Sequence, residues 1–441
     1  MKRVKAGIFG AGYVGLVTAA GLASRGLDIA VHDTSKEKIA TLTAGGLPIF
    51  EPGLEKLLAE QHITYIQTAK ELVTSCRYLF LCVGTPQAKN GEADLSFLES
   101  AVKTICRYAD SDKIVIIKST VPPGTGRLME KLSETMNIEH RITFVSNPEF
   151  LRQGNAVQDF LFPDRIVIGS DDDETGTEVL QLYKQWDCPK LQMNRESAEL
   201  TKYAANTFLA MKISYMNMMA GLAEKTGANI EDIERGIGSD SRIGKDFLKA
   251  GAGFGGSCFP KDLRALASIG TELNEELPLI RETLYINENQ AKAVLRKLST
   301  VFGGLLGRKI AVLGLSFKPM TDDVRSSPAV SAAEQLLLLG ADVNVYDPLV
   351  RDNPVAGAVK SPSLLDCLEG CDAAIIMTEW DEFREILKPK MLNKLKSPVI
   401  VDGRNMFQLK EMKKLSREFP LYYDSVGRQR VNTLLTANKI K

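Results

Sequence analysis

The sequence predicts an α/β fold in which two doubly wound domains are joined by a helical central domain. Apolar, strand-like runs alternate with helical patterns at the start of the chain, and the same alternation returns near its end. Between them, Glu196 to Thr226 contains one glycine and no proline, which is typical of one long core helix. The predicted domains are therefore residues 1–195, 196–300 and 301–441.

The first domain is expected to open with a buried strand from Val4 to Gly10, a helix from Gly12 to Gly26, and a second strand from Ile29 to Asp33. A strand–helix–strand order of this kind favours a parallel sheet. Further strands are predicted at 78–83, 114–118 and 143–146.

A second α/β unit begins near Lys309 and repeats the opening pattern without the complete glycine motif. Strands are predicted at 310–314, 342–347, 373–378 and 399–402, with a helix at 328–339. The last dozen residues are expected to form a loose tail.

The composition of the chain is that of an ordinary globular protein. It has 441 residues, of which 44% are hydrophobic, and its 55 basic residues balance its 55 acidic residues. A net charge of zero gives no electrostatic reason to expect nucleic acid or an acidic membrane as a partner, and no apolar run has membrane-spanning length. Seven scattered cysteines favour a reduced, cytoplasmic protein, and their spacing gives no metal site.

The long central helix carries apolar residues on more than one face. They are Phe208, Leu209, Met211, Ile213, Met216, Met218 and Met219. Two interpretations stay open at this point. The helix forms the core of the central domain, or it also packs against a second subunit.

A glycine-rich turn follows the first predicted strand and opens the first predicted helix. Gly10, Gly12 and Gly15 form a GxGxxG motif, which permits a tight turn and close approach of a pyrophosphate to a helix N-terminus. Asp33 ends the next strand, where its carboxylate is expected to accept hydrogen bonds from a ribose and to repel a 2′-phosphate. The motif therefore predicts NAD rather than NADP. Lys38 lies near enough to touch the same ribose, although a solvated helix lysine is the more common interpretation.

Cys258 lies between a glycine-rich loop and a predicted helix start, followed by Pro260 and Lys261. A thiol beside a helix N-terminus and a lysine is expected to have increased thiolate character. Cys258 is therefore a candidate covalent nucleophile.

Other polar residues lie at positions typical of catalytic or binding residues, although a residue of this kind, taken alone, is more often a surface or capping residue. Thr120 and Glu149 follow predicted strands, and Asp262 lies four residues after Cys258. Lys202 and Asn206 share one helix face, where they can stabilise an oxyanion. Lys318 and Arg325 are cations in a loop after a strand and can bind phosphate. The three histidines lie outside these motifs, which disfavours a histidine base.

Several motifs together resemble the nucleotide-sugar dehydrogenases of the UDP-glucose/GDP-mannose dehydrogenase family. They occur in the family's order and are GAGYVG, STVPPGT, NPEFL, LTKYAANTFLA, FGGSCFPKD and GLSFKPMTDDVRSSP. The resemblance implies two Rossmann-like domains and oxidation of UDP-glucose at C6 to UDP-glucuronate with NAD. It also implies a thiohemiacetal and then a thioester on Cys258, and a homodimer.

The resemblance also implies roles for individual residues. Lys202 and Asn206 match residues that stabilise charge on oxygen, and Thr120, Glu149 and Asp262 match residues around the reactive water. The residues implied in cofactor binding are Gly10, Gly12, Val14, Gly15, Asp33, Lys38, Thr85, Thr120, Lys261 and Arg325. Those implied in substrate binding are Glu149, Phe150, Leu151, Lys202, Asn206, Arg242, Phe247, Leu248, Lys249, Ala250, Gly251, Gly255 and Lys318, with Arg242 offered to a neighbouring subunit.

One departure from the family pattern is Gln153, which replaces an acidic residue near Glu149 and bears on fine specificity. Two alternatives to UDP-glucose oxidation stay open. One is the same chemistry on GDP-mannose or an N-acetylated UDP-hexosamine, although the STVPPGT form and the chain length favour UDP-glucose. The other is a catalytically silent NAD-binding protein, which the presence of Cys258, Lys202, Asn206 and Asp262 disfavours.

Overall fold

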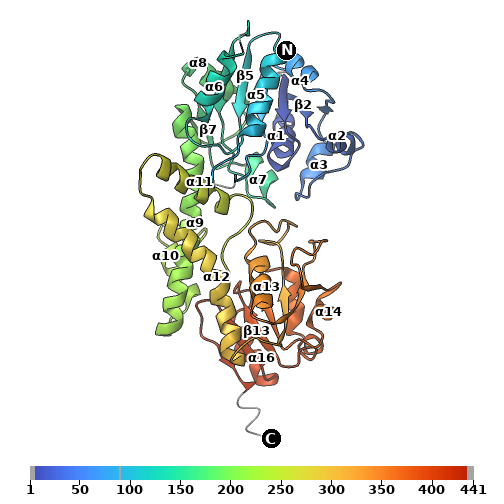
Figure 1. The fold of residues 1–441 in the computed structure, drawn as a ribbon, viewed down its shortest axis with the longest axis vertical. Helices are drawn as coiled ribbons and strands as arrows, with labels where there is room; N and C mark the ends of the chain where they lie inside the picture. The colour runs from blue at the N-terminus through green and yellow to red at the C-terminus, as the bar shows by residue number, and fades with distance from the viewer. Residues whose placement is uncertain (1–4, 89–90, 137, 435–441) are drawn as a thin grey trace. The chain divides into compact units, whose positions relative to one another are not determined.

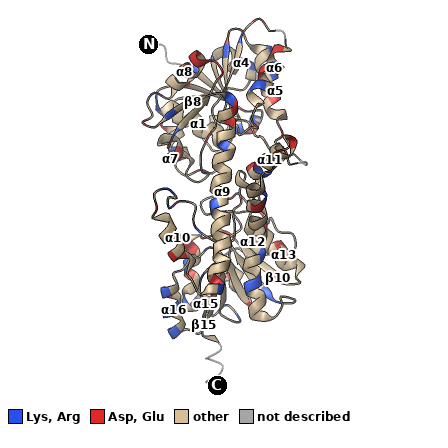
Figure 2. Ribbon diagram, turned by 90° about the vertical axis from the view of Figure 1, so that its left-hand side faces the viewer, with Lys and Arg blue, Asp and Glu red and all other residues tan. Residues whose placement is uncertain are grey.

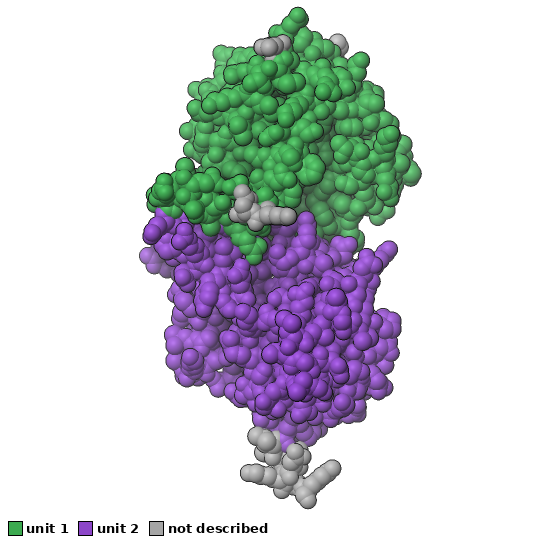
Figure 3. All heavy atoms as spheres, viewed as in Figure 1, with its two compact units in different colours: residues 1–205, 264–275 green, residues 206–263, 276–441 purple. Residues whose placement is uncertain are grey.

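The computed structural model describes residues 5–88, 91–136 and 138–434 (Figure 1). The chain divides into two compact units, coloured separately in Figure 3. Unit 1 comprises Met1–Ala205 and Arg264–Glu275, and unit 2 comprises Asn206–Leu263 and Glu276–Lys441. The helices α9 (Arg195–Thr226) and α11 (Phe259–Glu272) each contribute residues to both units.

Unit 1 contains an eight-stranded sheet with the order β3-β2-β1-β4-β5-β6-β7-β8. All neighbouring strands are parallel except β6 and β7. The strands are β1 (Lys5–Phe9), β2 (Asp28–His32), β3 (Ile63–Tyr65), β4 (Tyr78–Leu81), β5 (Lys113–Ile117), β6 (Ile142–Ser146), β7 (Ile166–Gly169) and β8 (Lys190–Met193). The helices are α1 (Tyr13–Ser24), α2 (Lys36–Thr43), α3 (Leu54–Ala59), α4 (Ala69–Ser75), α5 (Ser96–Tyr108), α6 (Thr125–Glu134), α7 (Ala156–Leu161) and α8 (Asp173–Leu182).

The sheet of unit 1 is covered on both faces, because successive residues of its central strands point in opposite directions. Ile8 of β1 packs into a cluster with α1, α3, α7 and α8, whereas Phe9 packs into a cluster with α4, α5 and α6. This is why the strands are apolar throughout rather than alternating. The strand order reverses between β1 and β4, where doubly wound sheets bind ligands.

Unit 2 contains a seven-stranded sheet with the order β11-β10-β9-β12-β13-β14-β15, in which the β14–β15 pair is antiparallel and the others are parallel. Its strands are β9 (Lys309–Leu313), β10 (Asp342–Tyr346), β11 (Val359–Lys360), β12 (Ala373–Ile376), β13 (Val399–Asp402), β14 (Tyr422–Ser425) and β15 (Val431–Asn432). Its helices are α10 (Ile230–Gly238), α12 (Pro278–Phe302), α13 (Pro328–Leu338), α14 (Leu364–Leu368), η1 (Asp381–Leu387), α15 (Pro389–Leu392) and α16 (Leu409–Glu418). Helices α12 and α13 cover one face, and α14, η1, α15 and α16 cover the other.

These observations confirm the predicted fold class and most of the predicted elements. The long helix begins at Arg195 and ends at Thr226, one residue longer than predicted. The predicted loose tail is wrong at Val431 and Asn432, because they pair with β14 as an edge strand. Val4 and residues 435–441 lie outside the described residues. Among the described helices, none combines the length and apolar character needed to cross a bilayer.

Candidate active site

The glycine motif forms a tight turn between β1 and α1. Gly10 has a φ of +101°, and a Cβ built there would lie 2.7 Å from the carbonyl oxygen of Cys82. A Cβ on Gly15 would lie 1.8 Å from the carbonyl oxygen of Gly10, so only glycine fits either position. A Cβ on Gly12 would meet nothing within 4 Å, so this glycine leaves open space at the start of α1. Val14, in the first turn of α1, packs partly against the apolar core.

The helix α1 begins without a side-chain cap and has no acidic residue in its first turn, which suits an anionic ligand. Asp33 lies beside this turn, because one of its oxygens accepts a hydrogen bond from the Ala11 amide at 2.7 Å and the other accepts one from the Ser35 amide at 2.8 Å. Lys38 Nζ lies 3.5 Å from the same carboxylate. The residues predicted to bind the adenosine ribose are therefore brought together.

Three predicted residues of unit 1 follow the neighbouring strands β4, β5 and β6. The Thr85 hydroxyl donates to the carbonyl oxygen of Thr120 at 2.8 Å, which joins the segments after β4 and β5. Glu149 follows β6 and is buried, and Lys202 Nζ of α9 lies 3.2 Å from its Oε1. Glu149 also accepts a hydrogen bond from the Leu151 amide, and the Lys202 ammonium lies 5.3 Å from the centroid of the Phe150 ring.

Lys118 is a buried cation that the sequence predicts only as the end of a strand. Its ammonium donates to the side-chain oxygen of Asn147 at 3.2 Å, just after β6. Burial lowers the pKa of Lys118 to about 8, the charge of Lys202 adds to this effect, and the Glu149 carboxylate opposes it. The Glu149 carboxylate therefore lies in the field of two buried lysines.

Cys258 differs from the other six cysteines in its exposure. Cys258 is an exposed residue, whereas the others are buried or half-buried, and none of the seven, all within the described residues, forms a disulfide. Burial raises the pKa of the Cys82 thiol to about 12 and that of Cys371 to about 11. Cys258 caps α11, since its carbonyl oxygen accepts the first helical hydrogen bond from the Asp262 amide at 2.8 Å. The thiol therefore stands at the positive end of a helix dipole, as the sequence predicts.

Asp262 is fully buried in the first turn of α11 and contacts two predicted residues. The Asn206 side-chain amide donates to its Oδ2 at 2.6 Å. Lys261 Nζ lies 2.7 Å from its Oδ1, in an ion pair that lacks hydrogen-bond geometry. Lys202 and Asn206, which helical spacing places together, thus each contact a different carboxylate.

The glycine loop before Cys258 lies against the segment after β9. A Cβ on Gly255 would lie 2.4 Å from the carbonyl oxygen of Ser326, and the Gly256 amide donates to the carbonyl oxygen of Arg325 at 2.8 Å. Arg404, which no sequence motif indicates, bridges the same segments. Its guanidinium donates to the carbonyl oxygens of Gly253 at 3.0 Å and Phe317 at 2.9 Å. Arg404 follows β13, and no local pattern indicates contacts so distant in sequence.

The remaining predicted substrate residues lie in unit 2. In the loop 247–251, Leu248, Ala250 and Gly251 are buried, Lys249 is exposed, and Phe247 has a φ of +62°. The Gly251 amide donates to the side chain of Asn217 on α9 at 2.8 Å.

Two of the three predicted cations of unit 2 pair with a carboxylate close in sequence, and the third lies beside an aromatic ring. Arg242 is exposed and pairs with Asp240 at 2.6 Å. Arg325 is also exposed and pairs with Asp323 at 2.6 Å, so both guanidinium groups face a neighbouring carboxylate. Lys318 Nζ lies 5.5 Å from the centroid of the Phe317 ring.

Comparison with known proteins covers nearly the whole chain. Three models of the UDP-glucose/GDP-mannose dehydrogenase family match, namely its NAD binding domain at residues 4–187, its central domain at 196–289 and its UDP binding domain at 311–409. The chain is 41% identical to the UDP-glucose 6-dehydrogenase TuaD of Bacillus subtilis, over 97% of this chain and 94% of that protein. It is also 41% identical to a UDP-glucose 6-dehydrogenase of Rhizobium meliloti, over 96% of this chain and 100% of that protein.

The solved structure of a UDP-glucose dehydrogenase from Pyrobaculum islandicum is similar, with a TM-score of 0.89 and 36% identity over 97% of this chain and 98% of that chain. A UDP-D-ManNAc dehydrogenase from Pyrococcus horikoshii is similar at a TM-score of 0.83 and 28% identity, over 96% of this chain and 99% of that chain. With matches to all three domain models and full-length relatives of this identity, the chain belongs to the UDP-glucose/GDP-mannose dehydrogenase family.

Proposed function

We propose that this protein oxidises UDP-glucose at C6 to UDP-glucuronate, with NAD as electron acceptor. The observation that carries the proposal is the exposed Cys258 thiol at the start of α11, four residues before the buried Asp262. The relatives at 41% identity are UDP-glucose 6-dehydrogenases, whereas the similar UDP-D-ManNAc dehydrogenase is 28% identical. This difference favours UDP-glucose over an N-acetylated hexosamine.

The chemistry needs a nucleophile that retains the sugar between two oxidations. The Cys258 thiolate adds to the C6 aldehyde to form a thiohemiacetal, whose oxidation leaves a thioester. Water then attacks the thioester carbon, and the C–S bond breaks to release the carboxylate and restore the thiolate. One UDP-glucose, two NAD⁺ and one water thus give one UDP-glucuronate, two NADH and three protons.

The other predicted residues take supporting roles in this scheme. Lys202 and Asn206 stabilise negative charge on the C6 oxygen, and Thr120, Glu149 and Asp262 orient water and move protons. Loop 247–251, Gly255, Lys318, Phe150 and Leu151 bind the nucleotide sugar. NAD, when bound, supplies the hydride acceptor for both oxidations, and the residues proposed to hold it are Gly10, Gly12, Val14, Gly15, Asp33, Lys38, Thr85, Thr120, Lys261 and Arg325.

The open space at Gly12 allows a direct test of the proposed pyrophosphate site. Gly12→Ala is expected to leave thermal stability nearly unchanged, because the added Cβ meets no atom within 4 Å and the φ of −96° suits alanine. The same Cβ would occupy the space into which the pyrophosphate fits, so NAD affinity is expected to fall about tenfold or more. Thermal unfolding without ligand and fluorescence titration with NAD measure the two effects.

Gly15→Ala serves as the matched comparison. Its Cβ would overlap the Gly10 carbonyl, so this variant is expected to lose stability before any ligand is added. If Gly12→Ala binds NAD with unchanged affinity, the proposal that the pyrophosphate binds at this turn is wrong.

The number of NADH molecules formed per UDP-glucose consumed by the purified protein tests the proposed function. Two per sugar are expected, with UDP-glucuronate as the product. One per sugar would mean release of the aldehyde and would contradict the thioester scheme. No NADH from UDP-glucose, but two from GDP-mannose or an N-acetylated UDP-hexosamine, would reassign the substrate, and none from any sugar would favour the silent binder.

A homodimer and a cytoplasmic location belong to the same proposal. Phe208, Tyr215 and Leu222 are spaced seven residues apart on α9 and are each about half exposed, so they form an apolar stripe. Figure 2 shows that charged residues are sparse along the middle of this helix. A second copy of the chain is the proposed occupant, with Arg242 reaching the partner's substrate, and sedimentation at twice the chain mass would support it. The cytoplasmic location is supported by the seven free cysteines.

A further inference from the structure

A buried carboxylate on the second turn of α9 joins three segments of unit 1. Glu199 is 2% exposed. Its Oε2 accepts a hydrogen bond from the Gly124 amide at 2.6 Å. Its Oε1 accepts hydrogen bonds from the Gly126 amide and the Ser146 hydroxyl, both at 2.8 Å. The carboxylate of α9 therefore accepts hydrogen bonds from two other segments, the start of α6 and the end of β6.

The two contacted glycines belong to the start of α6, which lacks a cap of its own. Gly124 is the N-cap residue and has no side chain to accept the first amide hydrogens of the helix. Glu199 supplies that acceptor from another helix, at the end of α6 where the dipole favours negative charge.

Each joined segment carries a residue with a proposed role in the reaction. The loop that ends at Gly124 begins with Thr120, four residues earlier. Ser146 ends β6 and stands three residues before Glu149, and Glu199 itself stands three residues before Lys202. One carboxylate thus sets the spacing of the segments that carry Thr120, Glu149 and Lys202.

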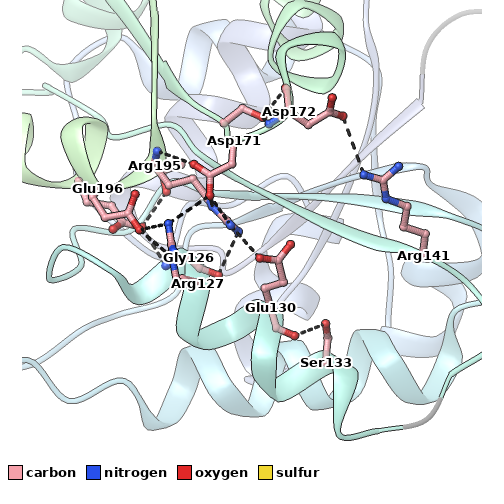
Figure 4. Close-up of polar contacts among 12 residues, drawn as sticks. Gly126, Arg127, Glu130, Ser133, Arg141, Asp171, Asp172, Arg195 and Glu196 are labelled. Carbon is pink, nitrogen blue, oxygen red and sulfur yellow. Dashed lines mark hydrogen bonds and ion pairs between the residues drawn. The ribbon is translucent and has the colours of Figure 1, made fainter.

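A neighbouring cation, Arg195, also contacts this turn at Gly126 (Figure 4). The Arg195 guanidinium, at the start of α9, lies 3.4 Å from the Gly126 carbonyl oxygen and bonds Glu130 at 2.7 Å and Asp171 at 2.6 Å. A Cβ on Gly126 would lie 3.0 Å from both the Arg195 side chain and the Glu199 carboxylate. Glycine at this position therefore lets both charged groups reach the backbone of α6.

We propose that Glu199 is a positioning residue for the oxidation, because it fixes the Thr120 loop against the segments of Glu149 and Lys202. This inference rests on the proposed function. Glu199 acts through the groups it holds, and touches neither substrate nor cofactor in this role.

Glu199→Gln tests the proposal, because the Gly124 and Gly126 amides bond different oxygens of Glu199, and in glutamine one of these two positions becomes an NH2 group that cannot accept. Hydrogen exchange at the Gly124 or Gly126 amide is expected to rise. Turnover per folded molecule is expected to fall roughly tenfold to a hundredfold, the range expected for a displacement of about 1 Å, with little change in KM for UDP-glucose. Both changes act on one loop, so their effects are not expected to multiply. In the double variant with Thr120→Ala, turnover is expected to be about as low as in the less active of the two single variants.

The matched control is Glu196→Gln on the same helix, whose side chain pairs with Arg127 of α6 at 2.9 Å near the surface. It is expected to leave turnover and amide exchange near wild type. If Glu199→Gln does not fold, Ser146→Ala removes one donor and permits the same comparison.

Normal turnover in Glu199→Gln, or losses that multiply independently with Thr120→Ala, would overturn the proposal. An inactive wild-type protein would instead contradict the proposed function. Hydrogen exchange at the two glycine amides would still test whether Glu199 holds the Thr120 loop.

Discussion

Replacing Cys258 with serine is expected to reduce formation of UDP-glucuronate by at least about a thousandfold. A serine hydroxyl is ionised far less than a thiol at neutral pH, so the aldehyde is no longer captured and its second oxidation stops. The fold is expected to persist, since position 258 is exposed and exposed substitutions usually change stability by less than about 0.5 kcal/mol. Product analysis by mass and NADH formation in single turnovers measure the loss.

Cys188→Ser is the matched control, because Cys188 is a free, half-buried cysteine outside every proposed site. It is expected to turn over at the wild-type rate. NAD affinity should be retained in both variants. Two NADH per sugar from Cys258→Ser at the wild-type rate would exclude Cys258 as the nucleophile.

Lys202→Met is expected to lower both turnover and stability. Lys202 is 3% exposed and Glu149 is 8% exposed, so removal of the ammonium leaves a buried carboxylate without its partner. Breaking a buried pair costs about 3–5 kcal/mol, and the nearby charge of Lys118 places the expected loss at the lower end. Turnover is expected to fall about a hundredfold to a thousandfold, as for the loss of one oxyanion donor. Chemical unfolding and steady-state kinetics measure the two losses.

A second substitution tests whether the lost stability comes from the unpaired Glu149 carboxylate. Adding Glu149→Gln removes the unpaired charge, so stability is expected to recover while turnover stays low. The control is Lys212→Met, which removes a lysine of the same helix whose ammonium donates to the Ile243 carbonyl oxygen near the surface. Near-normal turnover in Lys202→Met would exclude this lysine from the chemistry.

The sequence was sufficient to predict the elements whose residues carry strong local constraints. The turn at Gly10 needs a positive φ, and Asp33 follows a short apolar strand, so both features are visible within a few residues. The long helix was predicted for the same reason, because its composition alone excludes turns. The start of α11 followed from the glycine loop and Pro260.

The contacts between distant segments were not predictable in this way. Helical spacing placed Lys202 beside Asn206, but their partners Glu149 and Asp262 lie more than 50 residues away in the sequence. Arg404 and Glu199 bond mainly to backbone groups, which leave no residue pattern to detect. Gly255 was assigned to the sugar by resemblance, and the structure adds a packing reason, the close approach of Ser326.

The uneven exposure of the cysteines has a practical consequence for counting functional molecules. Six thiols are shielded to different degrees and five of them are buried, so an alkylating reagent applied briefly to the native protein should react first at position 258. Label incorporated per chain then becomes an active-site titration. It reports the fraction of a preparation that still holds a reduced, competent nucleophile, and it shows whether inactivation by peroxide in storage is damage to one sulfur atom or to the protein as a whole.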